Sequence, residues 1–443
     1  MTTLARRLRL VDYFSLAFGT MVGTGWLVVM DDWLIRGGAA GAILGFVIGG
    51  SLLFPIGYVY GKLVMAMPDA AGEIAYTAKV FPQSVSFATG WIMLLSYFVV
   101  CPYEAVAAAK IGGYLFPKLD SMELYRVGGK PVYLPHLVLS LLVVVLVTGM
   151  NYRGIQLTAR FQTWTTLSVI ALAIVFASAG LGHGSIANFK PLFQGGSAFI
   201  SILLIVQIVP FFMEGFESVG KSSEEAEDGF AGHHFFLAIS LAILVGILFY
   251  LIVISAVAYS APRETFMNAS FPTAVAFEKA IGSHWIGSLV MATAFLSLLK
   301  CFNGNMVASS RMFFALGRRG LIPRAAAHIH PENRTPSVAV LCIGFATGIV
   351  IFGGESMLVP IAEVGAVTAA VGWMAACASY VRMKPSTAGF AAAIAGLIIT
   401  SFMVLIKAIP AVPGHFTVAE WIAVAIWGAL GFALRRGTVH TDA

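Results

Sequence analysis

Long apolar runs without a charged residue recur along this chain, and they constrain its fold more than any other feature. A helix that crosses the hydrocarbon core of a bilayer needs about 20 consecutive apolar residues. Runs of about this length with no Asp, Glu, Lys or Arg lie at residues 13–30, 37–61, 80–103, 161–189, 229–262 and 385–406. Only 11% of all residues are charged, whereas soluble domains carry about 25%. The sequence therefore predicts an all-α polytopic membrane protein without a separate soluble domain.

The hydropathy pattern predicts about twelve transmembrane helices. We expect these spans at residues 11–35, 38–66, 86–116, 133–150, 156–181, 197–220, 233–260, 284–316, 336–353, 356–381, 387–408 and 418–435. Most of the Lys and Arg residues outside them fall on the side that also holds both termini. Because cytoplasmic loops are enriched in Lys and Arg, we expect both termini in the cytoplasm and the protein in the cytoplasmic (inner) membrane. This topology also accounts for the net charge of +6, so no nucleic-acid partner is expected.

The first predicted span carries three helix-weakening residues in the stretch GTMVGTGW, at Gly19, Gly23 and Gly25. Each glycine weakens a helix by about 1 kcal/mol relative to alanine. Non-helical backbone at membrane depth is tolerated only where it is buried in protein or lines a cavity. The stretch therefore predicts a discontinuous first helix. The alternative interpretation is that the glycines only allow close helix packing.

A second interrupted span supports the discontinuous helix. The sixth span contains PFFMEGFESVG, residues 210–220, with a proline and two glycines. Transporters built from inverted repeats have discontinuous helices at corresponding positions of the two halves. We therefore expect one transporter domain, residues 1–435, with a 5+5 inverted repeat. Its parts are a first five-span repeat at 11–181, a second inverted repeat at 197–381, two accessory helices at 387–435 and a cytoplasmic tail at 436–443.

The two breaks suggest the chemistry of the substrate. A broken helix exposes N–H groups, which attract a carboxylate, and carbonyl groups, which attract an ammonium group or a cation. The breaks therefore suit an α-amino acid, with Gly23, Thr24 and Gly25 offering N–H groups to its carboxylate. The candidate substrate-binding residues are Thr20, Val22, Gly23, Thr24, Gly25, Trp26, Phe212, Glu214, Gly215 and Phe216.

Four ionisable residues lie deep inside predicted spans: Glu104, Glu214, Glu217 and Lys300. A charge at mid-bilayer costs about 2.5–3.5 kcal/mol on insertion scales, so each needs a partner or a proton. Glu214 is placed to face a substrate. Glu217 either stabilises the bent backbone or takes part in proton coupling, and Glu104 either pairs with Lys300 or lines the site. We assign Lys300, Glu104 and Glu217 as candidate coupling residues.

The sequence predicts no catalytic residues, no metal site and no cofactor. The cysteines at 101, 301, 342 and 377 lie in apolar runs without the spacing of a disulfide framework or a zinc site. The histidines at 328 and 330 have no matching ligand cluster. The acidic run SSEEAED, residues 222–228, is interpreted as a solvated cytoplasmic exit from the sixth helix. An enzyme is therefore not expected.

Four stretches together resemble the amino acid–polyamine–organocation (APC) superfamily of permeases. They are GTMVGTGW, MPDAAGEIAYTAKVFPQSVSFATGW at 67–91, GFESVGKSSEEAED, and ASSRMFFALGRRGLIPRAAAHIHPENRTPSVAV. The resemblance covers the first ten spans. It implies a LeuT-type fold, alternating access, and amino acids or related amines as substrates. Arg319 stands where the family often has an acid, which enlarges the inner positive belt.

A second departure from the family concerns helix 5. Several proton-coupled relatives carry a lysine about fifteen residues after a glycine that corresponds to Gly154, but that position is Val169 here and helix 5 has no lysine. Lys300 on helix 8 lies eleven residues before Arg311, about 16 Å along the helix, and so close to the bilayer midplane. The family's cation site lies between helices 1, 5 and 8. We therefore expect Lys300 to replace the missing lysine and to bind freed carbonyls near Val22.

The sequence therefore predicts a secondary active transporter that imports an amino acid or related amine by alternating access, coupled to protons. Its expected partners are the small-molecule substrate, protons and the lipid bilayer. An amine, polyamine or ethanolamine permease is the main alternative, because three intramembrane acids exceed what a zwitterion needs. An amino acid exchanger is a further one. A channel would not need paired broken helices, and a membrane enzyme would need a catalytic cluster.

Overall fold

Long helices make up most of the structure, as the apolar runs predict. The computed structural model describes residues 6–194, 196–266, 269 and 271–439. The long helices are α3 (Met30–Ser51), α4 (Leu53–Ala66), α6 (Gln83–Leu115), α7 (Leu134–Arg153), α8 (Ile155–His183), α12 (His233–Ser260), α14 (His284–Arg318), α15 (Ser337–Val350), α16 (Leu358–Arg382), α17 (Thr387–Ala408) and α18 (Val418–Val439). Helix α13 (Pro272–Ile281) has ten residues, and α5 (Glu73–Ala78) has six.

Shorter elements interrupt or connect these helices. The interrupted pieces are α1 (Leu10–Met21), α2 (Gly25–Val28), α9 (Ala198–Val206), α10 (Val209–Met213) and α11 (Ser218–Lys221). Turns of 3-10 helix are η1 (Pro117–Leu119), η2 (Ile186–Phe189), η3 (Ser223–Glu225), η4 (Arg263–Thr265), η5 (Arg324–Ala327) and η6 (Ile351–Met357). Strands β1 (Glu123–Val127) and β2 (Lys130–Tyr133) form an antiparallel hairpin.

Nine helical stretches in the described part of the chain are long and apolar enough to cross a membrane. This number differs from the twelve predicted spans for identifiable reasons. The predicted spans 11–35 and 197–220 are divided into short helices. The stretch Ser337–Arg382 joins two predicted spans through η6, and Met30–Ala66 joins the end of the first predicted span to the second. The expectation of a polytopic all-α membrane protein is thus confirmed at the level of the helices.

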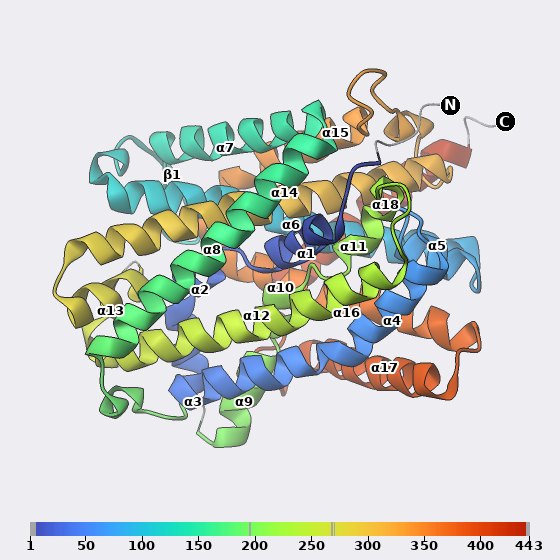
Figure 1. Cartoon of the computed structure of the whole chain (residues 1–443). Helices are drawn as coiled ribbons and strands as arrows, with labels where there is room; N and C mark the ends of the chain where they lie inside the picture. The colour runs from blue at the N-terminus through green and yellow to red at the C-terminus, as the bar shows by residue number, and fades with distance from the viewer. Residues whose placement is uncertain (1–5, 195, 267–268, 270, 440–443) are drawn as a thin grey trace.

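Four of the interrupted pieces lie at the centre of the bundle, whereas α9 lies at its edge. In Figure 1, α1, α2, α10 and α11 lie in the middle, and the long helices α6, α8, α12, α14 and α16 run alongside them. Helix α1 contacts α8, α12 and α14, and α10 contacts α16 and α3. The breaks are therefore enclosed by other helices, which is the condition for non-helical backbone at membrane depth.

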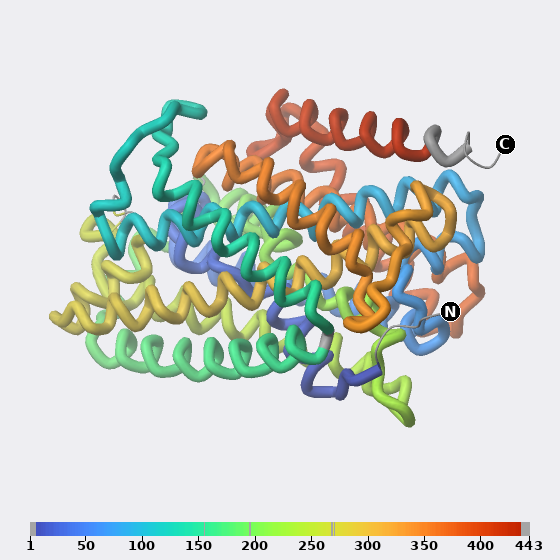
Figure 2. Tube along the Cα trace, turned by 90° about the horizontal axis from the view of Figure 1, so that it is seen from above, coloured from blue at the N-terminus to red at the C-terminus, as the bar shows by residue number. Residues whose placement is uncertain are grey.

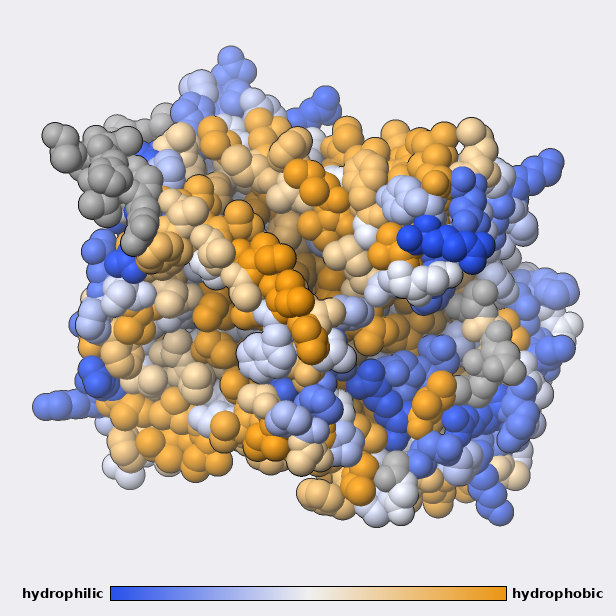
Figure 3. All heavy atoms as spheres, turned by 180° about the vertical axis from the view of Figure 1, so that it is seen from behind, coloured by the Kyte–Doolittle hydropathy of each residue, from blue (hydrophilic) through white to orange (hydrophobic). Residues whose placement is uncertain are grey.

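The two ends of the bundle differ from its middle. Apolar residues dominate the middle of the face in Figure 3, whereas hydrophilic residues gather at its two ends. Leu142, Val145 and Phe345 are among the large apolar side chains that remain exposed. In a soluble protein such a belt would promote association, but it suits contact with lipid.

The β-hairpin and the ends of the described chain mark the two ends of the bundle. The hairpin lies against η6 at one end, where the Tyr125 hydroxyl donates to the Phe352 carbonyl at 2.7 Å. Residues 6–9 and the last turns of α18 both lie toward the opposite end, on different sides of the bundle (Figures 1 and 2).

Candidate substrate site

The α1 break is a short extended segment between two helical pieces. Helix α1 ends at Met21, Val22 has φ −98° and ψ 98°, and α2 begins at Gly25. A Cβ placed on Gly23 would lie 1.8 Å from Oε1 of Glu104, and one on Gly25 would lie 2.3 Å from Cε1 of Phe212. Both glycines therefore leave space that side chains of other helices occupy, so the break and close packing occur together.

The second break contacts the first directly. Between α10 and α11 the backbone is extended at Glu214, and Gly215 has a φ of +132°, a conformation that side chains other than glycine rarely adopt. A Cβ on Gly215 would lie 2.6 Å from the backbone nitrogen of Met21. The positive φ and the close contact each require glycine at position 215. The contact brings the backbone of the sixth span directly against the end of α1.

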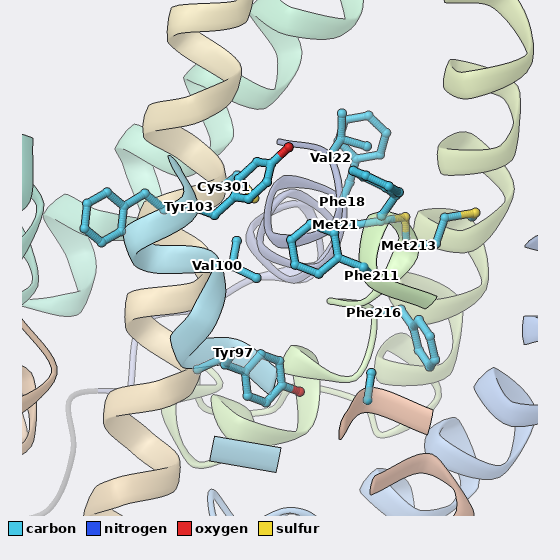
Figure 4. Packing of buried hydrophobic residues seen from close by; sticks show 14 of the residues in the cluster. Phe18, Met21, Val22, Tyr97, Val100, Tyr103, Phe211, Met213, Phe216 and Cys301 are labelled. Carbon is cyan, nitrogen blue, oxygen red and sulfur yellow. The ribbon is translucent and has the colours of Figure 1, made fainter. Parts of the chain in front are cut away.

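A small cavity lies where the two breaks meet. Its lining comes from α1, α2, α6, α10, α14 and the two breaks, and comprises Thr20, Met21, Gly23, Gly25, Val100, Tyr103, Glu104, Phe211, Phe212, Glu214, Cys301 and Asn305. Figure 4 shows Val100, Phe211 and Cys301 around the end of α1. The cavity measures about 10 Å³, which is the space that one water molecule needs. Binding of an amino acid or an amine therefore requires these side chains to move.

Glu104 enters the α1 break from α6 and binds its free donors. Its Oε1 accepts a hydrogen bond from the Thr24 backbone N–H at 3.1 Å, and its Oε2 accepts one from the Thr24 hydroxyl at 2.7 Å. The carboxylate is only 2% exposed. Glu104 thus lines the cavity, which is one of the two roles predicted for it, and forms no ion pair with Lys300 in the described structure. Glu104 therefore binds the Thr24 N–H, which was expected to bind a substrate carboxylate.

The two acids of the second break have different partners. Glu214 accepts a hydrogen bond from the Ser96 hydroxyl, and its Oε2 has no hydrogen-bond partner among the described residues. Glu217 accepts one from the Gly215 N–H at 3.1 Å. Glu214 lines the cavity, whereas Glu217 binds the bent backbone and is not part of the lining.

Helix α14 supplies donors to the free carbonyls at the end of α1. The Lys300 ammonium donates to the Val22 carbonyl and, at 3.5 Å, to that of Gly19. Ser297 donates to Val22 at 3.1 Å and to Gly23 at 2.7 Å. Asn305 donates to the Thr20 carbonyl at 3.1 Å. The expected contact between Lys300 and a carbonyl near Val22 is therefore present, while its role in coupling stays a prediction.

Two aromatic candidates lie outside the cavity. Trp26 stacks on Phe176 with ring centroids 5.5 Å apart, and Phe216 packs against Trp373 at 5.4 Å. Both are fully buried packing residues in this conformation. Phe212 does line the cavity. Among the described residues, no group of three or more His, Cys, Asp or Glu side chains is placed to hold a metal ion.

Sequence reasoning missed several polar partners of the site. The fully buried Lys221, one residue beyond the predicted span 197–220, pairs with Glu73, which also accepts a hydrogen bond from Tyr60. A detectable signal was present for α14, because Ser297, Lys300, Cys301 and Asn305 recur at three- and four-residue spacing and so share one helix face.

The interpretation of residues 222–228 as a solvated exit is wrong for part of the run. Glu225 is buried and forms an ion pair with the equally buried Arg311 at 3.0 Å. Glu224 binds Arg318 and the backbone N–H of Ala70. Arginine side chains of α14 thus hold this acidic run against the bundle, because a buried carboxylate needs a charged or hydrogen-bonded partner.

The fold and this cavity define a class: a helical membrane protein with a polar site enclosed at two touching helix breaks. A family model described as "Amino acid permease" matches residues 12–434. The chain therefore belongs to the amino acid permease family, which confirms the resemblance noted above. The family consists of permeases, in agreement with transport rather than catalysis.

Individual relatives are distant but extensive. The methylthioribose transporter of Bacillus subtilis (strain 168) is 24% identical over 342 residues, 75% of this chain and 72% of the relative. The lysine-specific permease LysP of Escherichia coli (strain K12) is 23% identical over 407 residues, 86% of this chain and 79% of the relative. The low-affinity putrescine importer PlaP of the same organism is 25% identical, over 64% of this chain and 61% of the importer.

Proposed function

We propose that this permease is a secondary active transporter that imports an amino acid or a related amine across the cytoplasmic membrane by alternating access. The observation that carries the proposal is the enclosed cavity at the two helix breaks. Its lining combines carboxylates, a hydroxyl, an amide and aromatic rings, which are the groups that bind an ammonium group. The named functions of the relatives, which include amino acid and putrescine transport, support the same substrate classes.

The proposal includes twelve membrane crossings. Gly38, at φ +67°, interrupts the helical stretch between the first and second crossings, and η6 separates the ninth from the tenth. Each broken span counts as one crossing in this proposal. The first is formed by α1 and α2, and the second by α9, α10 and α11. We assign crossings one to five and six to ten to the two inverted repeats, with both termini in the cytoplasm. The shared end of residues 6–9 and α18 supports an even number of crossings.

Proton coupling through Lys300 is the second part of the proposal. Its ammonium is fully buried and bound to carbonyls of the α1 break, and helices α1, α8 and α14 pack against one another around it. Loss of its proton would weaken the bonds that hold α1 to α14, because a neutral amine is a poorer donor than an ammonium group. Protonation would in this way control the movement of the broken helix.

The test is uptake of labelled amino acids and amines into proteoliposomes, with and without an inward proton gradient and with and without sodium. We expect accumulation that depends on the proton gradient and not on sodium. Lys300→Ala should lose this accumulation while binding or exchange survives. Lys79→Ala, which removes an exposed lysine, is the matched control and should behave as the wild type. Sodium-dependent uptake by the wild type, or pH-driven accumulation in Lys300→Ala, would contradict the coupling proposal.

A further inference from the structure

The position of Glu104 bears on the class of substrate, and this inference rests on the proposed transport function. The α1 break was expected to offer its N–H groups to a substrate carboxylate. In the structure, the Glu104 carboxylate already accepts hydrogen bonds from both the N–H and the hydroxyl of Thr24. The next residue of the break, Gly25, is covered by the Phe212 ring. The protein thus supplies its own carboxylate at the place that an amino acid carboxylate would take.

The balance of charge in the cavity favours a cation. Of the lining residues described in the structure, two are carboxylates, Glu104 and Glu214, and none is basic. Neither carboxylate forms an ion pair with a described side chain. Lys300 lies outside the lining, and its ammonium is bound to the Val22 carbonyl. A second carboxylate brought in by a zwitterion would meet like charge in a medium of low dielectric constant.

The free hydrogen-bonding atoms of the cavity are oxygens. Glu214 Oε2, Asn305 Oδ1 and the Tyr103 hydroxyl have no hydrogen-bond partner among the described residues. All three belong to residues that line the cavity, and each is buried. A carboxylate and an amide oxygen can only accept, so they require a ligand that donates. An ammonium group has three donors and no acceptor. The rings of Tyr103, Phe211 and Phe212 can in addition bind a cation through their faces.

We propose that the substrate of this permease is an organic amine without an α-carboxylate, and that Glu104 takes the place of the missing carboxylate. The ammonium group of the substrate binds Glu214 and Asn305, and Glu104 remains on Thr24. An α-amino acid could bind there only by displacing Glu104. That would leave a buried carboxylate without its two donors, which is costly.

Matched pairs of ligands that differ only in the α-carboxylate test this inference in the wild type. Suitable pairs are putrescine and ornithine, cadaverine and lysine, histamine and histidine, and ethanolamine and serine. Competition binding to the purified protein should show at least one amine that binds about ten- to a hundredfold more tightly than its amino acid, the range expected for loss of charge-assisted hydrogen bonds. No amino acid should bind more tightly than its amine. The opposite order would overturn the inference but leave the proposed transport function intact.

Glu104→Ala tests the role of the residue itself. Removing the side chain frees the Thr24 donors, so the affinity ratio of amine to amino acid should fall at least tenfold. A ratio measured within one variant does not depend on the fraction of protein that folds. Glu420→Gln is the matched control, because Glu420 is also buried and accepts a backbone hydrogen bond from a threonine, Thr417, at 2.6 Å. It should keep the wild-type ratio.

The remaining outcomes are also decisive. An unchanged ratio in Glu104→Ala would show that Glu104 does not exclude the carboxylate, and would overturn the inference. The wild type is tested for binding of every ligand in these pairs and for their accumulation in proteoliposomes. If none binds and none accumulates, the proposed function fails, and the inference fails with it.

Discussion

Single glycines in α1 and in the break that follows it are sites where side chains from other helices enter. A Cβ on Gly19 would lie 1.9 Å from Nε2 of Gln162, and one on Gly23 would lie 1.8 Å from Oε1 of Glu104. The segment therefore carries helix-weakening residues for two reasons at once. They weaken the helix, and they leave room for polar side chains: Gln162 binds the Ser15 carbonyl of α1, and Glu104 binds the free Thr24 N–H of the break. An alanine at either position would have to displace a hydrogen-bonding side chain.

Gly215 gives the sharpest prediction for a single residue. Gly215→Ala places a side chain at φ +132° and 2.6 Å from the Met21 nitrogen. Strained backbone alone costs on the order of 1–3 kcal/mol, and the steric clash adds to this cost. We expect a clearly lower midpoint of thermal unfolding for the purified variant and loss of ligand binding.

Gly149→Ala is the control for this substitution, because it also adds one methyl group to a glycine. Gly149 lies in α7, and a Cβ there would meet no atom within 4 Å. Its unfolding midpoint should stay at or above the wild-type value. If Gly215→Ala unfolds at the wild-type temperature, the two breaks do not contact each other as described.

At the scale of the elements, a buried ion pair joins α5 to α11, close to the second break. Lys221 and Glu73 are both fully buried and bound to each other, and Tyr60 of α4 donates to Glu73. Removing one partner of a buried pair leaves the other charge unpaired, which lowers the free energy of unfolding by about 3–5 kcal/mol. Glu73→Gln should therefore lower the thermal unfolding midpoint strongly.

A double substitution separates the charge from the packing. Replacing both partners of a buried pair with neutral residues is often nearly neutral, because no charge is left unpaired. We expect Glu73→Gln combined with Lys221→Met to recover much of the stability lost in Glu73→Gln alone, again measured by thermal unfolding. If the double variant has as low an unfolding midpoint as Glu73→Gln, the ion pair itself stabilises the fold, and the loss in the single variant is not caused by the unpaired Lys221 charge.

The elements were predictable to different degrees. Apolar length located the spans, and the glycines and Pro210 located both breaks, because local composition determines these features. The contact between Glu104 and Thr24 was not predictable, because it joins residues 80 positions apart on different helices. Lys221 lies one residue beyond the predicted span 197–220, yet tertiary packing buries it. The sequence thus identified which residues are unusual for a membrane helix, while their partners depended on how the helices pack.

At the scale of the whole molecule, ion pairs join separate elements toward both ends of the bundle. At the end that holds residues 6–9, Arg318 of α14 binds Asp69 at 3.0 Å and Glu224 at 2.6 Å. Toward the other end, Arg36 of α3 binds Glu363 of α16 at 3.1 Å. In the alternating-access cycle that we propose, one such set opens while the other stays closed. The ion pairs of Arg318 are partly exposed, so they suit a contact that breaks in each proposed cycle.

Cys301 provides a reporter of this opening, since it lines the cavity and is only 2% exposed. Opening of the bundle should expose its thiol to a small maleimide, with the exposed Cys342 first replaced by serine. Arg318→Gln removes two ion pairs, each worth about 0.2–1 kcal/mol when exposed. Together they are worth about 0.4–2 kcal/mol, so we expect the labelling of Cys301, measured by mass spectrometry, to become about two- to thirtyfold faster. Arg126→Gln, which breaks an ion pair inside the β-hairpin, should leave the rate unchanged. An equal rate in Arg318→Gln and Arg126→Gln would show that the Arg318 ion pairs do not hold the cavity closed.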